Sequence, residues 1–186
     1  LVFTITGLIA LLLVPYEAFT RGFDMAEILT CIFLIYFCGM SITAGYHRLW
    51  AHKAYDANGF VRVVLAIGGA MALQNSILHW ASDHRVHHRH VDDNDHDPYS
   101  AKRGFWYSHI GWMLREYQVH RYSDYSNCRD LQKDPIVVWQ HKQYLAIMLT
   151  ANFAIPIFLG WLNGDIWGML LLAGVFRLVA VHHITF

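Results

Sequence analysis

Four long apolar segments constrain this chain more than any other feature of its sequence. A helix needs about 20 apolar residues to cross the hydrocarbon core of a bilayer, and four segments approach that length. They are residues 1–19, 25–46, 144–162 and 166–186. We therefore expect an all-α, polytopic membrane protein with four transmembrane helices in contact with the lipid bilayer.

Short polar turns join these segments into two hairpins. The sequence TRGFD separates the first two segments, and NGD separates the last two. Turns this short place both connections on one side of the membrane, so residues 47–143 must lie on the other side. Twelve of the 14 Lys and Arg residues fall between Arg48 and Lys142. Because basic residues are enriched on the cytoplasmic side, we expect a helical, histidine-rich cytosolic segment between the hairpins.

The segment 59–80 is apolar at first and turns polar at Gln74 and Asn75, with Gly68 and Gly69 near its middle. We expect a helix packed on or partly within the membrane face rather than a fifth span. A span here would place the two histidine-rich stretches of the chain on opposite sides of the membrane.

Composition excludes some classes of function. The formal net charge is zero, which gives no indication of a nucleic-acid partner. The cysteines Cys31, Cys38 and Cys128 have neither CxxC nor disulfide-framework spacing. Both ends of the sequence lie inside apolar stretches without a signal peptide or a helix-ending residue. We therefore expect a single domain over residues 1–186 that is truncated at both ends.

Histidine is the most informative residue type, with 13 copies in the chain. His47 and His52 form HRLWAH at the end of the second apolar segment, and His84, His87 and His88 form DHRVHH after residues 59–80. The latter three share one face of an α-helix. The former two diverge by about 140° unless the helix ends or unwinds between them. Because neutral imidazole binds iron, zinc and copper, we predict that these five residues bind metal.

The remaining histidines outside the spans have no partner at ligand spacing along the sequence, so we expect surface or supporting roles for them. They are His79, His90, His96, His109, His120 and His141. His182 and His183 lie within the fourth apolar segment with Arg177. Polar groups at membrane depth usually face the interior of a helical bundle or a cavity, and we expect the same here.

The pattern of histidines narrows the metal chemistry. The H-E-x-x-H motif of zinc hydrolases is absent, and so are the Glu-x-x-His pairs of soluble di-iron bundles. A haem needs only one or two axial histidines. Two separate multi-histidine motifs indicate a centre with more than one metal. At the face of an apolar bundle, an acyl chain is the natural substrate.

Two stretches carry a resemblance to a known family. GMSITAGYHRLWAHKAY and LQNSILHWASDHRVHHRHVDDNDHDPYSAKRGFWYSHIGWML resemble membrane-bound fatty acyl desaturases of the stearoyl-CoA desaturase type, including bacterial-like delta-9 acyl desaturases. The first box of that family, H-x4-H, corresponds to HRLWAH, and the second, H-x2-H-H, corresponds to HRVHH. The agreement runs from about Ser41 to Leu114.

The resemblance implies an enzyme that consumes O2 at a di-iron centre and inserts a cis double bond, commonly at delta-9, into a long saturated acyl chain. It makes the five box residues His47, His52, His84, His87 and His88 iron ligands. A di-iron alkane or lipid hydroxylase on the same scaffold is the nearest alternative. A non-enzymatic metal-binding membrane module, such as a transporter or a metal sensor, is the alternative from another class.

The resemblance also implies substrate contacts. Asn75 and Asp83 match positions that contact the polar head of the substrate, although a helix cap and an orienting partner of His84 are simpler roles for them. Trp80 and Trp112 are candidates for the wall of an acyl tunnel, or for an interfacial aromatic belt.

Other implications concern the rest of the enzyme. Cys31 and Ile35 would close the far end of the tunnel. The family needs an Asn/His pair and a last H-x2-H-H box after HHITF, so we expect residues 1–186 alone to be inactive. The family also implies an acyl-CoA or acyl-lipid substrate and an external cytochrome b5-, ferredoxin- or rubredoxin-type electron donor. Four basic residues fit a phosphorylated head group or anionic lipids: Arg85, Lys102, Arg103 and Arg115. We expect the bacterial inner membrane, or the endoplasmic reticulum membrane for a eukaryotic protein.

Overall fold

The computed structural model describes residues 2–113 and 124–185, and all regular secondary structure in these ranges is helical. Four of its helices are long and apolar enough to cross a membrane. They span Val2–Thr20, Met25–Ala51, Tyr144–Asn163 and Ile166–Thr185. The predicted all-α fold with four candidate spans is therefore confirmed.

The first span is α1 (Val2–Thr20), and the second consists of α2 (Met25–Met40) followed by the π-helical segment η1 (Ser41–Ala51). The third span is built from α7 (Tyr144–Leu149), η7 (Thr150–Ala154) and α8 (Ile155–Asn163). The fourth is built from α9 (Ile166–Met169), η8 (Leu170–Phe176) and α10 (Arg177–Thr185). Between the second and third spans lie α3 (Gly59–Met71), α4 (Ile77–Arg89), α5 (Phe105–His109) and α6 (Pro135–Lys142). One-turn 3-10 helices lie at Ala101–Arg103, Gly111–Met113, Ser126–Cys128 and Leu131–Lys133.

Short polar side chains set where several helices begin. Asp24 and Glu27 form a capping box at the start of α2, in which each side chain accepts the backbone N–H of the other residue. Asn58 caps α3, Ser76 caps α4 and Asp134 caps α6 through the same kind of bond. These caps satisfy N–H groups that have no partner within the helix.

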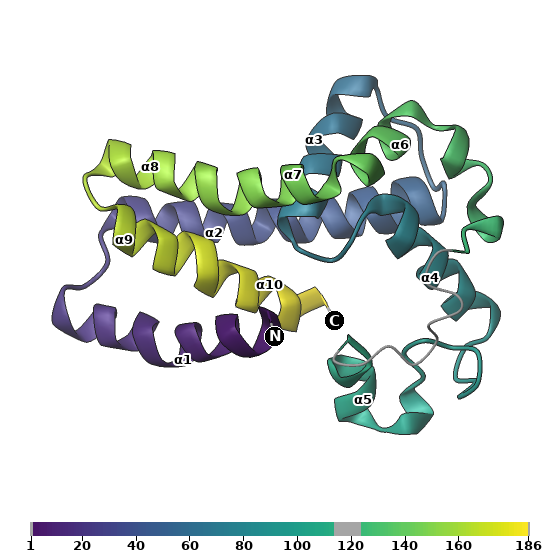
Figure 1. Cartoon of the computed structure of the whole chain (residues 1–186), viewed down its shortest axis with the longest axis horizontal. Coiled ribbons are helices and arrows are strands. Elements are labelled where there is room, and N and C mark those ends of the chain that lie inside the picture. The colour runs from purple at the N-terminus through teal and green to yellow at the C-terminus, as the bar shows by residue number, and fades with distance from the viewer. Residues whose placement is uncertain (1, 114–123, 186) are drawn as a thin grey trace.

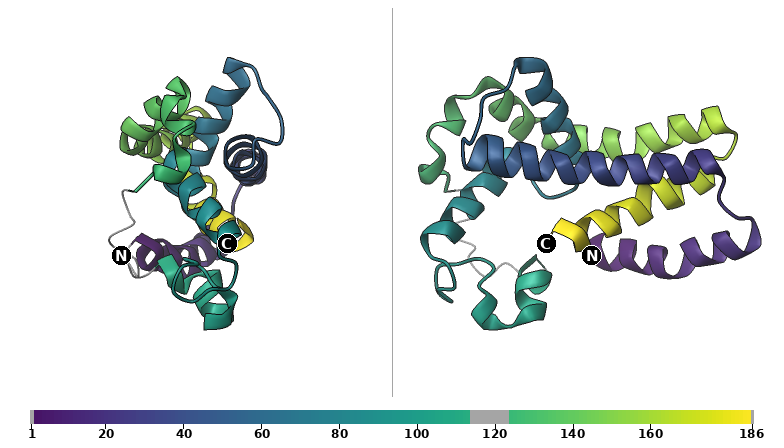
Figure 2. Two further views of the ribbon diagram at one scale, coloured as in Figure 1. Left: turned by 90° about the vertical axis from the view of Figure 1, so that its right-hand side faces the viewer. Right: turned by 180° about the vertical axis from the view of Figure 1, so that it is seen from behind.

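The two interhelical turns lie at the same end of the bundle, as Figure 1 shows, while α4, α5 and α6 lie at the other end. The view from behind in Figure 2 agrees. Asn163, before the second turn, donates a hydrogen bond of 2.6 Å to the Asp24 carboxylate after the first. The spans thus form the two expected hairpins. The side of the membrane on which the histidine-rich segment lies stays a prediction.

The segment 59–80 is divided between two helices, which corrects the expectation of a single helix there. Leu73 and Asn75 have φ values of 57° and 72°. Non-glycine residues rarely adopt this left-handed conformation, and it ends a right-handed helix. The 13 residues of α3 are too few to cross a bilayer, so the segment is not a span. The second histidine box consequently lies within α4 rather than after it.

Arg177 is fully buried inside the bundle, as expected for a charge at membrane depth. Its guanidinium donates to the Met71 carbonyl at 2.9 Å, to the Asn152 side-chain oxygen at 2.8 Å and to the Ala173 carbonyl at 3.1 Å. These bonds join the fourth span to the end of α3 and to the third span. His182, which is also buried in the fourth span, has its Nε2 atom 3.0 Å from the Ala72 carbonyl oxygen.

Gly69 allows α3 to pack directly on the second span. A Cβ atom at this position would fall on the ring of Tyr46. Tyr46 is fully buried, and its hydroxyl accepts a hydrogen bond of 2.7 Å from Gln140. We therefore expect Gly69→Ala to destabilise the protein by about 1–3 kcal/mol through overpacking, measured as a lower thermal midpoint in detergent. Gly39→Ala is the control, because a Cβ there meets nothing within 4 Å. An equal shift in both variants would contradict the packing argument.

Candidate metal centre

A π-turn brings the two histidines of the first box together. The η1 segment ends the second span, and the backbone N–H of His52 donates to the His47 carbonyl at 2.9 Å, an i→i+5 bond. The two imidazole rings consequently lie 4.5 Å apart between centroids. This unwound geometry removes the divergence of about 140° that a regular α-helix would impose on the two histidines, so the condition expected for their convergence is met.

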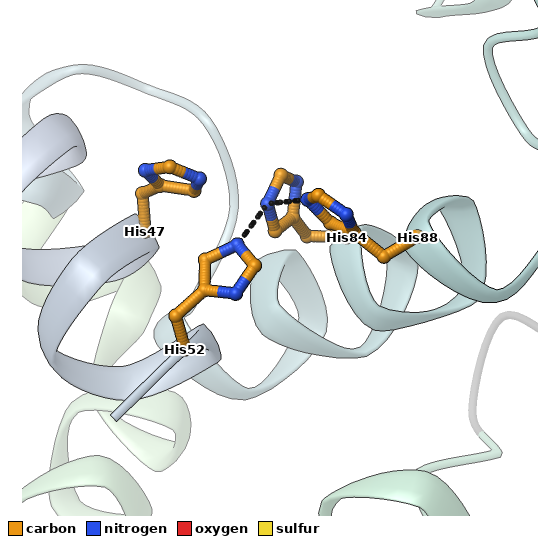
Figure 3. A group of neighbouring side chains, drawn as sticks. All are labelled: His47, His52, His84 and His88. Atoms are coloured by element: carbon orange, nitrogen blue, oxygen red, sulfur yellow. Dashed lines mark hydrogen bonds between the residues drawn. The ribbon is translucent and has the colours of Figure 1, made fainter. Parts of the chain in front are cut away.

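The second box meets the first across a helix–helix contact between α4 and η1. The Nε2 atom of His84 lies 3.0 Å from Nε2 of His52 and 3.1 Å from Nε2 of His88 (Figure 3). One ring nitrogen from each of His47, His52, His84 and His88 lies within 4.8 Å of the others. We call these four residues the histidine cluster.

The spacing in the histidine cluster fits a transition-metal ion. Two nitrogens bound at about 2.1 Å and at a right angle to each other lie about 3.0 Å apart, which matches the two Nε2 separations from His84. Burial first, and then the neighbouring imidazoles, lower the pKa of His84 to about 3. Burial and then His52 lower the pKa of His88 as well. These shifts favour the neutral form of His84 and His88, which is the form that binds metal.

Aromatic groups hold His84 in place. The Trp80 ring stacks on it with centroids 4.7 Å apart and planes 25° apart, and the Tyr99 hydroxyl lies 3.2 Å from its Nδ1. When Nδ1 carries the proton and donates it to Tyr99, Nε2 presents its lone pair to the cluster. Such an outer contact fixes the tautomer and the ring orientation of a metal-binding histidine.

Asp83 does not orient His84, which corrects one of the two roles considered for it. Its carboxylate lies 3.3 Å from Nε2 of His79, one helical turn earlier. On an α-helix, residue i faces i−4 and points away from its immediate neighbour.

His87 lies on α4 beside the histidine cluster but is not one of its four members. Its Nδ1 lies 2.9 Å from the carboxylate of Asp97, which is almost fully buried. Its ring centroid is 6.2 Å from that of His84 and 5.5 Å from that of His88. A carboxylate that accepts the Nδ1 proton leaves Nε2 as the ligand atom, so the metal role of His87 stays a prediction.

Asp97 is a supporting residue that the sequence reasoning missed, and its effect is testable. We expect Asp97→Asn to lower metal affinity by about 10- to 100-fold, because the amide orients His87 less strongly than the carboxylate. Metal content after dialysis against a graded chelator measures this. Asp95→Asn is the matched control, since Asp95 is an exposed carboxylate of the same loop. Equal metal loss in both variants would rule out a specific role for Asp97.

Arg85, within the second histidine box, is hydrogen-bonded to the backbone of the first box. Its guanidinium donates to the carbonyls of Trp50 and Ala51, directly before His52, at 3.0 and 3.1 Å. It also donates to the Asn127 carbonyl at 3.0 Å and to both oxygens of Asp130 at 2.8 and 3.0 Å. These bonds use all five N–H groups of the side chain. The head-group role considered for Arg85 is therefore wrong, because its donors are satisfied within the protein.

The other basic residues considered for head-group binding have mixed surroundings. Arg103 donates to the Asn94 carbonyl and lies over the Tyr107 ring, 4.9 Å from its centroid. Lys102 is exposed, so its role stays a prediction. Arg115 lies outside the described residues.

The candidate substrate residues surround the turn before α4. Asn75 is not the helix cap: Ser76 caps α4, and the Asn75 side chain accepts the Ser76 N–H at 2.9 Å. Trp80 donates to the side-chain oxygen of Gln74 at 3.3 Å, and Gln74 donates to Thr185 of the fourth span at 2.5 Å. Sequence reasoning gave Gln74 no role, although a polar residue directly after an apolar run was the available signal.

Trp112, Cys31 and Ile35 are the remaining residues predicted to line the substrate site. The Trp112 ring packs on Tyr99, with centroids 5.1 Å apart. Cys31 is buried in α2 and Ile35 packs beside it against the core, so their role at a tunnel end stays a prediction.

Two expectations about the other histidines need correction. Ring nitrogens of His90 and His96 lie within 4.8 Å of each other and of an Asp93 oxygen, which is ligand spacing. His109 on α5 lies 3.1 Å from Nδ1 of His183 on α10. No local sequence pattern indicates these partners, because each contact depends on the tertiary fold or on loop geometry. His120 lies outside the described residues.

His79 and His141 keep supporting roles in the structure. The His79 ring faces Asp83 and lies 3.3 Å from the Tyr125 hydroxyl. His141 on α6 faces the hydroxyl of Ser76 at 2.6 Å. Neither belongs to a group with ligand spacing among the described residues, as the sequence analysis expected of them.

Fold and site together define a polytopic membrane protein with a cluster of four imidazoles, spaced as for a metal ion, at one end of its helical bundle. Comparison with known proteins gives the family. The fatty acid desaturase model matches residues 26–185, and the chain belongs to that family. The four apolar helices and this membership make it an integral membrane protein.

Individual relatives agree with the family. The chain is 44% identical over 172 residues to a probable acyl-CoA desaturase of Schizosaccharomyces pombe, covering 92% of this chain and 36% of that protein. It is 42% identical over 147 residues to the acyl-CoA Delta-9 desaturase of Acheta domesticus, covering 76% and 39%. It is also 42% identical over 139 residues to the acyl-CoA Delta12-desaturase of the same organism, covering 72% and 39%. The chain thus spans 36% to 39% of the length of these relatives.

Proposed function

We propose that this chain forms the membrane core of an O2-dependent fatty acyl desaturase. In the reaction, a –CH2–CH2– unit, O2, two electrons and two protons give a cis –CH=CH– unit and two waters. The observation that carries the proposal is the close approach of three imidazole rings. The Nε2 atom of His84 lies 3.0 Å from Nε2 of His52 and 3.1 Å from Nε2 of His88. Membership of the desaturase family gives this cluster its reaction class.

Iron is the metal that we propose, with O2 as co-substrate. Imidazole also suits zinc and copper, but zinc has no redox chemistry, and removing hydrogen from an unactivated chain needs an oxidant. Iron would supply that oxidising power from O2, which no amino-acid side chain can provide. We propose that the histidine cluster would hold one ion and that His87, through Nε2, would be a ligand of a second ion.

The chain's own residues hold and shield the reacting groups. Trp80 stacks on His84 and is joined through Gln74 to Thr185 of the fourth span. We propose that the acyl chain passes along this path, with Trp80 and Trp112 as its walls. Head-group contacts at Asn75 and Asp83 complete the proposed substrate site. The surrounding apolar spans would keep water from the reacting carbons.

The proposal also covers the acyl carrier, the position of the double bond and the electron donor. The relatives named above act on acyl-CoA by their names, so we propose acyl-CoA as the substrate. Delta-9 is the proposed position, and a Delta-12 relative of equal identity makes it the property most in need of measurement. We propose a cytochrome b5-, ferredoxin- or rubredoxin-type electron donor that is external to residues 1–186, since the three cysteines of these residues are fewer than the four that an iron–sulfur cluster requires.

We also propose that the histidine cluster faces the cytosol. The cluster lies at the end of the bundle opposite the two short turns, and 12 of 14 Lys and Arg residues lie between Arg48 and Lys142. Labelling of single cysteines with a membrane-impermeant reagent tests this in sealed vesicles of known orientation. We expect a cysteine at position 102 to be labelled only when the cytosolic face is accessible. Labelling only from the opposite face would overturn the assignment.

Product analysis tests the proposed reaction. The protein encoded by the complete reading frame should be expressed in a host that lacks unsaturated fatty acids of its own at the tested position. We expect a cis delta-9 monounsaturated acyl product that forms only with O2 and is absent without iron. A hydroxylated product would favour a hydroxylase on the same scaffold. Metal binding without any oxygen-dependent product would favour a non-enzymatic metal module.

A further inference from the structure

A second group of metal-binding side chains lies on the loop that follows α4. It consists of His90, Asp93 and His96, and one ligand atom from each lies within 4.8 Å of the others. We call it the loop cluster. It shares no residue with the histidine cluster, and all three side chains are partly exposed, so an ion can reach it from solvent.

The backbone of the loop places these three residues on one side. The N–H of Asp93 donates to the His90 carbonyl at 2.9 Å, and the N–H of His96 donates to the Asp93 carbonyl at 3.2 Å. These two consecutive turns bring one ligand atom of each residue within 4.8 Å of the others. The Nδ1 atom of His96 lies 2.8 Å from the Asp93 carboxylate, and the His90 and His96 rings stack 4.9 Å apart.

Other bonds hold the loop in this shape. The buried carboxylate of Asp97 accepts the N–H groups of Asp92 and Tyr99 at 2.9 and 3.1 Å. The Asp92 carboxylate in turn accepts the Ala101 N–H at 3.0 Å. Because the backbone is fixed before any ion arrives, binding costs little ordering entropy, and only side-chain rotations remain to be made.

We propose that His90, Asp93 and His96 bind one divalent transition-metal ion, with water completing its coordination. Two imidazoles and one carboxylate form a donor set that zinc, nickel, copper and ferrous ions accept, whereas calcium and magnesium prefer oxygen alone. His96 would bind through Nδ1 when its proton is on Nε2. The ligand atoms already lie within 4.8 Å of one another, so small rotations of the side chains bring them to the roughly 3–3.4 Å separation of ligands on one ion.

Zinc binding tests the proposal independently of enzyme activity. The protein encoded by the complete reading frame, purified in detergent, carries His52→Ala and His88→Ala to disable the histidine cluster. We expect this parent to bind Zn2+ at the loop cluster, measured by equilibrium dialysis with metal analysis. Adding His90→Ala or His96→Ala should remove one equivalent of Zn2+ per chain, and adding Asp93→Asn should weaken binding at least about tenfold.

The matched control is Asp95→Asn, which removes the same charge from the same loop but belongs to no group with ligand spacing. It should keep the full equivalent. Unchanged stoichiometry in both histidine variants would overturn the proposal, and so would equal loss in the Asp95→Asn protein.

A second measurement covers the case in which the parent does not fold. The protein with intact boxes is loaded with iron and then titrated with Zn2+. His96→Ala should lower bound zinc by one equivalent and leave the iron content unchanged. Simultaneous loss of iron, or undiminished zinc, would show that the loop cluster is not an independent site. Because the readout is metal content, failure of the desaturase assignment leaves this result interpretable.

Discussion

Replacing His84 by alanine is expected to lower iron content and desaturase activity by at least about 100-fold. Removing a direct ligand should exceed the 10- to 100-fold loss typical of an outer contact. His84 is the most central member of the histidine cluster, because its Nε2 is the atom that both His52 and His88 approach. Iron per protein, measured by elemental analysis, and product formation, measured by lipid analysis, should fall together.

His141→Ala is the matched control for that experiment. It removes the same side chain at another partly buried position, where the ring contacts the Ser76 hydroxyl rather than the histidine cluster. We expect iron content to be retained and activity to stay within about twofold, the range of an ordinary substitution. Comparable losses in both variants, or retention in both, would refute the ligand assignment.

Replacing Arg85 by lysine is expected to destabilise the junction of the two boxes by about 2–4 kcal/mol, although the charge is kept. Lysine presents a single ammonium group and cannot reproduce the five-donor fork. It would leave backbone carbonyls of the first box and one oxygen of Asp130 without their donor. A lower thermal midpoint and reduced iron loading should appear together, because the junction sets the distance between the histidines.

Lys53→Met gives the comparison for Arg85. Lys53 contacts the same Asp130 carboxylate at 2.8 Å, but its side chain is 60% exposed. Exposed ion pairs contribute less than about 1 kcal/mol, so this variant should melt close to the parent and load iron normally. If the lysine substitution at position 85 were as mild as Lys53→Met, the fastening role of Arg85 would be excluded.

The spans and the pairing of the boxes were predictable because both depend on patterns along the chain. Apolar length identified the four candidate spans, and short turns identified the hairpins. The spacing of His84 and His88 was also enough to predict that the two side chains lie together, since residues four apart share a helical face. A π-turn brings the ring of His52 next to that of His47. The choice between an α- and a π-turn depends on packing between helices, and no local sequence pattern reveals it.

The supporting residues were not predictable because their partners come from the tertiary fold. Arg85 fitted a phosphorylated head group or anionic lipids in sequence, and only the return of the chain at Asn127 and Asp130 shows that its donors are used within the protein. Asp83 adjoins His84 in sequence, yet the helix turns it toward His79. Asp97 reaches His87 by way of a loop whose shape depends on a left-handed residue, Asp92.

The π-helical end of the second span has a consequence for redesign. Stabilising a protein by making its helices more regular is a common strategy, and a designer would naturally convert η1 (Ser41–Ala51) into ideal α-helix. That change would rotate His52 away from His47 by about 140°, while the box kept every residue of its motif. An engineered sequence of this kind would still match the family by its motif and would have lost the geometry that the motif encodes. The irregular turn is therefore as much a part of the box as its two histidines.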